Sequence, residues 1–132
     1  MTGRIVSYSL RKEGTAYISP DFQVREFACR DGSDKVVIDL RLVHVLQRIR
    51  DHFGKSVHIN SGYRTRYYNT KVGGAANSQH LHGTAADITV NGVAPSVVAD
   101  YVETLMPDTG GIGRYKTFTH VDVRKRKARW TG

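Results

Sequence analysis

The sequence has only one cysteine, Cys29, three prolines and no long run of apolar residues among its 132 positions. A single cysteine excludes an internal disulfide, so stability must come from a hydrophobic core or from a bound ion. No apolar stretch approaches the roughly 18 to 20 residues that a membrane-spanning helix needs, and residues 1–10 lack the apolar segment of a secretory signal. We therefore expect no membrane partner and synthesis in the cytoplasm, with release or another export route to any target outside it.

Acidic residues are scarce as well. The chain has 12 Asp and Glu residues and 20 Lys and Arg residues, which gives a formal charge of +8. Such an excess attracts an anionic partner over long range, and both nucleic acid and bacterial cell wall qualify. Much of the excess lies at residues 124–129, in the run RKRKAR. Two interpretations of this run stay open: a solvated terminus, or a contact surface for an anionic partner.

The overall composition is that of a folded protein. Hydrophobic residues make up 39% of the chain and charged residues 24%, a balance typical of globular domains. A chain of 132 residues is too short for two independent cores and a linker. We therefore expect one monomeric domain over residues 1–132, with a basic tail from about residue 124.

Hydrophobic periodicity predicts two helices. The first spans residues 34–54, where Ser33 or Asp34 would cap the first amides and Gly54 would end the helix in a left-handed conformation. The second begins at Pro95, which is a favourable first residue for a helix, and runs to about residue 106.

Three short stretches show the period of a strand, at residues 56–60, 84–90 and 118–124. Residues 63–83 show neither period, so we expect loops there around at most a short helix, where functional sites are often found. Strands mixed irregularly with two helices predict an α+β fold, with a mostly antiparallel sheet and helices packed on one face. The other face would then be free for chemistry.

Three residues fit the ligand inventory of a catalytic zinc site. Successive side chains of a strand point to opposite faces, so Asp87 faces away from the apolar side of its strand, and His120 projects together with Asp122. Zinc is held by imidazole nitrogen and carboxylate oxygen, and a catalytic site supplies three protein ligands. His80, Asp87 and His120 would supply them for one zinc ion on the free face; the alternative is that they are polar groups satisfied by hydrogen bonds.

The pattern S-x-H-x-x-G-x-A-x-D at residues 78–87 resembles the signature of the zinc D-alanyl-D-alanine carboxypeptidase and L-alanyl-D-glutamate endopeptidase family. The resemblance continues upstream in SGYRT at residues 61–65 and downstream in GIGRY at 111–115 and HVDV at 120–123. It spans about residues 27–124, and short phage-type and prophage-type members look most similar. It implies the fold shared with the signalling domain of hedgehog proteins.

The resemblance also implies roles for individual residues. His80, Asp87 and His120 fall on the three zinc-ligand positions. Arg64 would bind a substrate carboxylate or the developing oxyanion, with pairing to a nearby acid as the alternative. Ser78 would hydrogen-bond the substrate or orient its own loop.

Aromatic residues and one further histidine flank the expected cleft. Four tyrosines lie near the expected cleft: Tyr63, Tyr67, Tyr68 and Tyr115. They either line a peptide groove, with Tyr63 as the substrate contact, or pack against the sheet. His82 lies two residues from His80 and is expected at the rim of the site, or as a plain surface histidine.

The general base is the point where the sequence departs from the family pattern. Many members carry an acid three positions, or a histidine two positions, before the last zinc ligand, and here those positions are Thr117 and Phe118. The leading substitute is Asp122, on the same strand face as the last ligand. Asp122 has an equally weighted alternative role, orienting an imidazole or pairing with Arg64 or Arg124. Further loop candidates for the base are Glu26 and Asp108.

These observations predict a zinc peptidase that hydrolyses amide bonds in the stem peptides of bacterial peptidoglycan, as a carboxypeptidase or an endopeptidase, by means of a zinc-activated water. The alternative is a catalytically inactive, zinc-stabilised module for cell-wall binding or assembly, which the missing upstream base favours. A basic nucleic-acid binder is a weaker third hypothesis, because no recognised nucleic-acid motif accompanies the charge.

Overall fold

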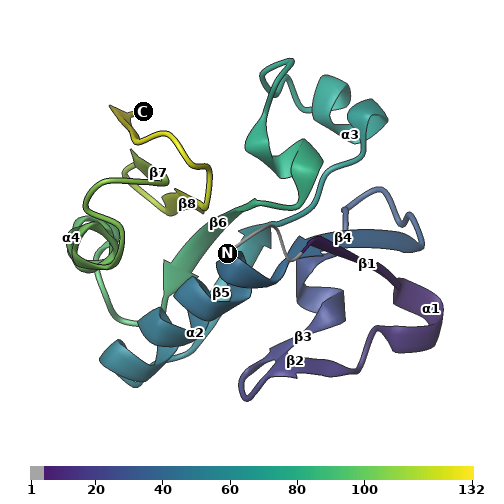
Figure 1. Cartoon of the computed structure of the whole chain (residues 1–132), viewed down its shortest axis with the longest axis horizontal. Coiled ribbons are helices and arrows are strands. Elements are labelled where there is room, and N and C mark those ends of the chain that lie inside the picture. The colour runs from purple at the N-terminus through teal and green to yellow at the C-terminus, as the bar shows by residue number, and fades with distance from the viewer. Residues whose placement is uncertain (1–4) are drawn as a thin grey trace.

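The computed structural model describes residues 5–132 (Figure 1). Its strands are β1 (Ile5–Ser9), β2 (Tyr17–Ser19), β3 (Phe22–Gln23), β4 (Lys35–Asp39), β5 (Val57–Ser61), β6 (Ala85–Val90), β7 (Gly111–Arg114), β8 (Thr119–Asp122) and β9 (Ala128–Thr131). Its α-helices are α1 (Leu10–Glu13), α2 (Leu40–Phe53), α3 (Arg66–Lys71) and α4 (Pro95–Leu105), and two 3₁₀ helices are η1 (Val24–Phe27) and η2 (Gln79–His82).

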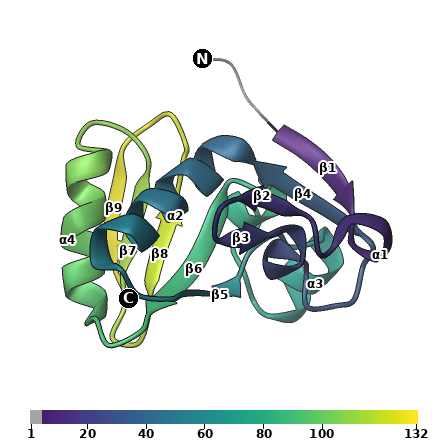
Figure 2. The same cartoon turned by 90° about the horizontal axis from the view of Figure 1, so that it is seen from below.

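Five strands form the central sheet, in the order β5-β6-β8-β7-β9. All neighbours in this sheet are antiparallel except β7 and β9, which run parallel. β1 pairs with β4 and β2 with β3 in two small antiparallel sheets. α2 contacts β5 and β6, α4 contacts β7 and β8, and the two helices contact each other, so both cover the same face of the central sheet (Figure 2). The predicted α+β class is confirmed.

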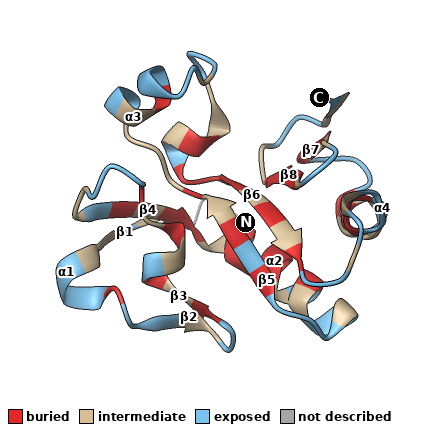
Figure 3. Ribbon diagram, turned by 180° about the vertical axis from the view of Figure 1, so that it is seen from behind, coloured by how far each residue is buried: buried red, intermediate tan, exposed pale blue. Residues whose placement is uncertain are grey.

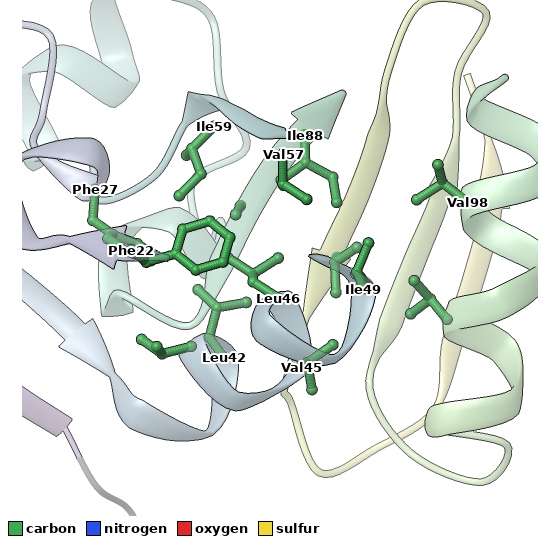
Figure 4. Close-up of a cluster of buried hydrophobic side chains, with 14 of the residues drawn as sticks. Phe22, Phe27, Leu42, Val45, Leu46, Ile49, Val57, Ile59, Ile88 and Val98 are labelled. Carbon is green, nitrogen blue, oxygen red and sulfur yellow. The ribbon is translucent and has the colours of Figure 1, made fainter. Parts of the chain in front are cut away.

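The hydrophobic core lies between this sheet and the two helices. From Ala86 on, buried residues of β6 alternate with partly buried ones (Figure 3). Ala86 and Ile88 belong to the core, and the side chains between them point to the opposite face of the sheet. From α2, the fully buried Leu42, Leu46 and Ile49 point into the same cluster (Figure 4). Burial of a side chain of this size contributes about 1.5–3 kcal/mol. The core therefore fixes which face of β6 remains for polar residues.

The expected start of the first helix, near Ser33 or Asp34, is wrong. Residues 35–39 form β4, paired with β1, and α2 begins only after Asp39, whose side chain accepts a hydrogen bond from the Arg41 amide. β4 runs straight into α2, and its buried Ile38 lies four residues before the buried Leu42. The helical period of α2 therefore continues into β4 when the sequence is read alone. Asp34 instead accepts hydrogen bonds from Ser9 and Arg11.

The remaining predicted elements are present. Gly54 ends α2 with a φ of 63°, in the left-handed region that favours glycine. β5, β6, β8 and α4 lie where periodicity predicted them, and the loop region 63–83 contains only the short α3 and η2. No periodicity indicated β1, β2, β3, β7 or β9, because strands of two to five residues are too short to show a clear alternation.

The end of the basic run is not a solvated tail. Residues 128–131 form β9 and extend the sheet beside β7. The guanidinium of Arg129 pairs with Glu103 at 2.8 Å and donates to the backbone oxygen of Met106 at 2.6 Å. Only Lys125, Arg126 and Lys127 stay exposed in a turn.

Across the described residues 5–132, no helix has the length and apolar character needed to cross a membrane.

The start of α2 yields a test of stability. Asp39 is fully buried and pairs with Arg41 at 2.6 Å, so we expect Asp39→Ala to lower the free energy of unfolding by about 1–3 kcal/mol, measured by urea denaturation. Asp39→Asn keeps a capping oxygen and should lose less. Asp34→Ala, at the cap position expected from the sequence, should cost less than Asp39→Ala; the reverse order would contradict this assignment of the helix start.

Candidate metal centre

Two of the three predicted ligands face each other across neighbouring strands. In the antiparallel register of β6 and β8, Asp87 lies opposite His120, and Asp87 Oδ1 lies 2.9 Å from His120 Nδ1. His80 completes the group from η2, with its Nε2 3.3 Å from Asp87 Oδ2. One donor atom from each residue lies within 4.8 Å of the others, so the structure brings the three together on the sheet face away from the helices.

His80 is held by the two loops that carry the sequence motifs. Its Nδ1 lies 2.7 Å from the carbonyl oxygen of Gly62, and its own carbonyl accepts the amide of Arg64 at 3.0 Å. Ser78 caps η2 by accepting the His80 amide at 3.2 Å. Gly62 itself packs so closely on Phe27 that a Cβ would lie 2.9 Å from that backbone. The close approach therefore requires glycine and fixes the His80 ring.

The hydrogen bonds decide which nitrogen of each histidine is free. A carbonyl oxygen only accepts, so His80 Nδ1 carries the proton and Nε2 presents a lone pair to Asp87. On the other ring, Nε2 lies 2.7 Å from Asp122 Oδ2 and donates to that carboxylate, so in the neutral ring His120 Nδ1 carries the lone pair and faces Asp87. Two lone pairs and a carboxylate thus converge, an arrangement that a cation between them satisfies. The donor set fits zinc.

Asp122 lies on the far side of the His120 ring from Asp87. It is fully buried, and both of its oxygens are held by Arg124, at 2.8 Å from Nε and 2.7 Å from Nη2. Burial alone raises the pKa of Asp122, but Arg124 and His120 outweigh burial and hold that pKa well below its usual range. This placement fits the role of orienting an imidazole and does not fit the expected role of general base, because the carboxylate does not face the converging donors.

Charge in the centre is balanced in favour of a cation. Burial raises the pKa of Asp87, yet the adjoining imidazoles of His120 and His80 outweigh burial and hold that pKa well below its usual range. Burial lowers the pKa of His120, yet the carboxylates of Asp122 and Asp87 on either side of the ring outweigh burial and raise that pKa. Carboxylates on both sides of one imidazole therefore stabilise positive charge, which a divalent ion would also supply.

Two glycines of β7 make room for the polar face. Gly111 lies opposite Asp122 and Gly113 opposite His120 in the register of β7 and β8. A Cβ on Gly111 would lie 2.2 Å from Asp122 Oδ2, and one on Gly113 would lie 2.6 Å from the indole of Trp130. The G-x-G spacing therefore places two gaps on one strand face, each filled by a side chain of the site.

The donors open into a cleft of about 500 Å³. Arg64 and Ser78 lie on its wall, and Tyr115 and Phe118 form an aromatic part of the wall together with Trp130. The sequence did not single out Trp130, although its position as the only tryptophan, directly after the basic run, was a visible signal.

Several other expected contacts lie outside the cleft. Tyr63 is half-buried, burial raises its pKa, and it is not among the residues that line the cleft. His82 is exposed and does not line the cleft. The expectation that Tyr63 contacts substrate is therefore not supported by the geometry.

The loop acids considered as substitutes for the base are also elsewhere. Glu26 accepts the Gln23 amide at 2.8 Å and lines a separate hollow with Cys29. Asp108 is exposed in the turn after α4, and Thr117 is exposed before β8. Among residues 5–132, Asp87 is the one carboxylate on the cleft wall.

A second hollow, of about 530 Å³, lies between the first half of α2 and the segment after β8. It is slightly larger than the cleft, but its lining is mainly apolar, with His44 as its one histidine and no acid. It offers no metal-ligand set, so the cleft is the candidate functional site.

The three donors of this centre should be necessary for zinc binding. Replacing His80, Asp87 or His120 by Ala should abolish tight binding, because each removes one of three donors. The measurement is zinc content after dialysis and competition with a chelator. His82→Ala, which changes an exposed histidine two residues from a ligand, should bind like the wild type. One zinc ion per chain in a triple-alanine variant would contradict the site.

Comparison with known proteins agrees with this geometry. Over 44 residues the chain is 46% identical to the zinc D-Ala-D-Ala carboxypeptidase of Streptomyces albus G, a match that covers 33% of this chain and only 17% of that relative. The relative and the His-Asp-His donor set together support the predicted zinc ion. The model of the Peptidase M15 family matches residues 20–122, which include all three donors and Asp122. The chain belongs to the Peptidase M15 family.

Proposed function

We propose that the protein is a zinc peptidase that hydrolyses amide bonds in the stem peptides of bacterial peptidoglycan. The observation that carries this proposal is the convergence of His80, Asp87 and His120 at the base of an open cleft. The family is one of peptidases, and the name of the Streptomyces relative specifies a D-Ala-D-Ala substrate for that protein. Release of this chain from the cytoplasm to the wall is part of the same proposal.

His80 Nε2, His120 Nδ1 and an oxygen of Asp87 would hold the ion. When bound, zinc supplies a Lewis acid for a carbonyl oxygen and a source of nucleophilic hydroxide near neutral pH. The protein fixes these donors beforehand, through the Gly62 carbonyl on one ring and Asp122 on the other. Such outer partners orient metal ligands and tune their affinity.

Arg64 is the cation positioned for the substrate. Its Nε donates to Ser61 Oγ at 3.2 Å and its Nη1 to Asn69 Oδ1 at 3.2 Å. Asn69 is buried and in turn donates to the Ala75 carbonyl at 2.8 Å. The guanidinium thus lies on the cleft wall, with its Nη2 3.6 Å from Asp87. A planar fork held in this way suits a peptide carboxylate or the developing oxyanion.

The surface charge suits the same substrate. The chain carries +8, and Lys125, Arg126 and Lys127 are exposed in the turn before β9. Cell walls carry peptide carboxylates and anionic polymers, which a basic surface attracts over long range.

One observation favours the second candidate function, a catalytically inactive zinc-stabilised module for wall binding or assembly. Within the described part of the chain, no carboxylate other than Asp87 lines the cleft. Hydrolysis requires a proton acceptor near the attacking water, whereas binding does not.

Cleavage of purified peptidoglycan separates the two functions. The zinc-loaded protein should release new amino groups, and His80→Ala should release none, because it lacks a zinc donor. Chemical analysis of the products also assigns the activity: free D-alanine indicates a carboxypeptidase, and a new amino group within the stem indicates an endopeptidase. Sedimentation with the wall, retained zinc and no new amino groups would support the inactive module instead.

Asp122→Asn tests whether this residue positions His120 or acts as the base. Loss of a residue that orients a ligand should weaken zinc binding by about 10–100-fold, while activity at saturating zinc stays within about tenfold of the wild type. Loss of a general base would lower kcat by about 10²–10⁴-fold even at saturating zinc. The measurement is kcat against zinc concentration; a large loss of kcat with unchanged zinc affinity would restore Asp122 as the base.

A further inference from the structure

Trp130 brings the C-terminal strand into the cleft. It lies on β9, beyond residues 20–122 that the family model matches, and its ring centroid is 4.9 Å from that of His120. The indole is half-exposed and lines the cleft. It therefore forms part of the wall beside the donor set rather than part of the core.

Contacts with neighbouring residues fix the position of this indole. Gly113 lies directly beneath it, with room for no Cβ, and the Arg124 guanidinium lies 5.4 Å from the ring centroid. Its Nε1 donates to the phenolic oxygen of Tyr115 at 2.9 Å. Tyr115 in turn stacks on Phe118, with centroids 4.3 Å apart and an interplanar angle of 10°. Contacts with Gly113 and Arg124 thus hold Trp130, and stacking on Phe118 holds Tyr115.

The direction of the Trp130–Tyr115 hydrogen bond has a chemical consequence. An indole nitrogen can only donate, so the Tyr115 oxygen accepts this bond and its own O–H is left to donate. In the described part of the chain, the Tyr115 hydroxyl has no hydrogen bond to an acceptor. It lines the same cleft as Arg64 and the donors. A peptide offers carbonyl and carboxylate oxygens, which are the acceptors that such a donor matches.

We propose that Tyr115 is a substrate-binding residue that donates a hydrogen bond to a carbonyl or carboxylate oxygen of the bound peptide. Trp130 is the positioning residue that keeps Tyr115 a donor, and its ring gives the peptide an apolar surface to pack against. The identity of the peptide rests on the proposed function. If Trp130 and Tyr115 served only to stabilise the fold, we would expect both to be buried. Both side chains are instead half-exposed in the cleft.

The chain provides its own probe for this proposal. Trp130 is the only tryptophan, so its fluorescence reports the cleft alone. Metal-free protein, which cannot use zinc to cleave, is titrated with the stem pentapeptide L-Ala-γ-D-Glu-L-Lys-D-Ala-D-Ala, and binding is followed by Trp130 emission and by calorimetry. Binding of the peptide by the wild type should change the emission.

Tyr115→Phe should raise the Kd about tenfold while zinc content and Tm stay at wild-type values, because it removes one donor and keeps the ring. Trp130→Phe, followed by calorimetry, should raise the Kd as well, by about threefold to tenfold. Tyr67→Phe is the matched control, since Tyr67 is exposed and lies outside the cleft, and it should leave the Kd unchanged.

An unchanged Kd for Tyr115→Phe overturns the inference, and so does a wild-type protein that binds none of the peptide. Binding of the peptide without cleavage by the zinc-loaded protein would overturn the proposed peptidase and leave the inference standing. Where cleavage is observed, Tyr115→Phe should raise KM more than it lowers kcat, which a merely structural role would not produce.

Discussion

The site depends on the register between β6 and β8. Because these antiparallel strands pair Asp87 with His120, a carboxylate and an imidazole from residues far apart in the chain meet on one face of the sheet. Side chains alternate along a strand, so a slip of β8 by one residue would turn His120 into the core and bring Val121 to the cleft beside Asp87. The packing of α2 and α4 against the opposite face fixes this register, since Ile88 and Val121 are fully buried there.

The polar face is a network of buried charge, and it links folding to the ion. Asp122 is fully buried but is neutralised by Arg124 and hydrogen-bonded to His120, as a buried carboxylate requires. Gly111 gives this carboxylate its space. The network leaves one nitrogen of each histidine free to face Asp87. A cation at that point stabilises the folded chain, in a domain with a single, unpaired cysteine.

Much of this arrangement could be predicted from local patterns. The alternation in β6 and β8 put Asp87 and His120 on the polar face before any contact was known, and the motif around His80 marked the third donor. The errors have physical causes. Ile38 matched a helical period while lying in β4, because strand and helix meet without a break at Asp39. The basic run was interpreted from charge alone, although Arg129 and Trp130 are held by Glu103 and Tyr115.

The sequence by itself determined the donor types, the face of each strand on which they lie and the family, because these depend on residue identity and on a period of two along a strand. Only the tertiary structure decided which side of His120 faces Asp122 and which faces Asp87, and that β9 carries Trp130 into the cleft. Those facts follow from pairings between distant segments, such as β7 with β9, and local periodicity carries no information about them.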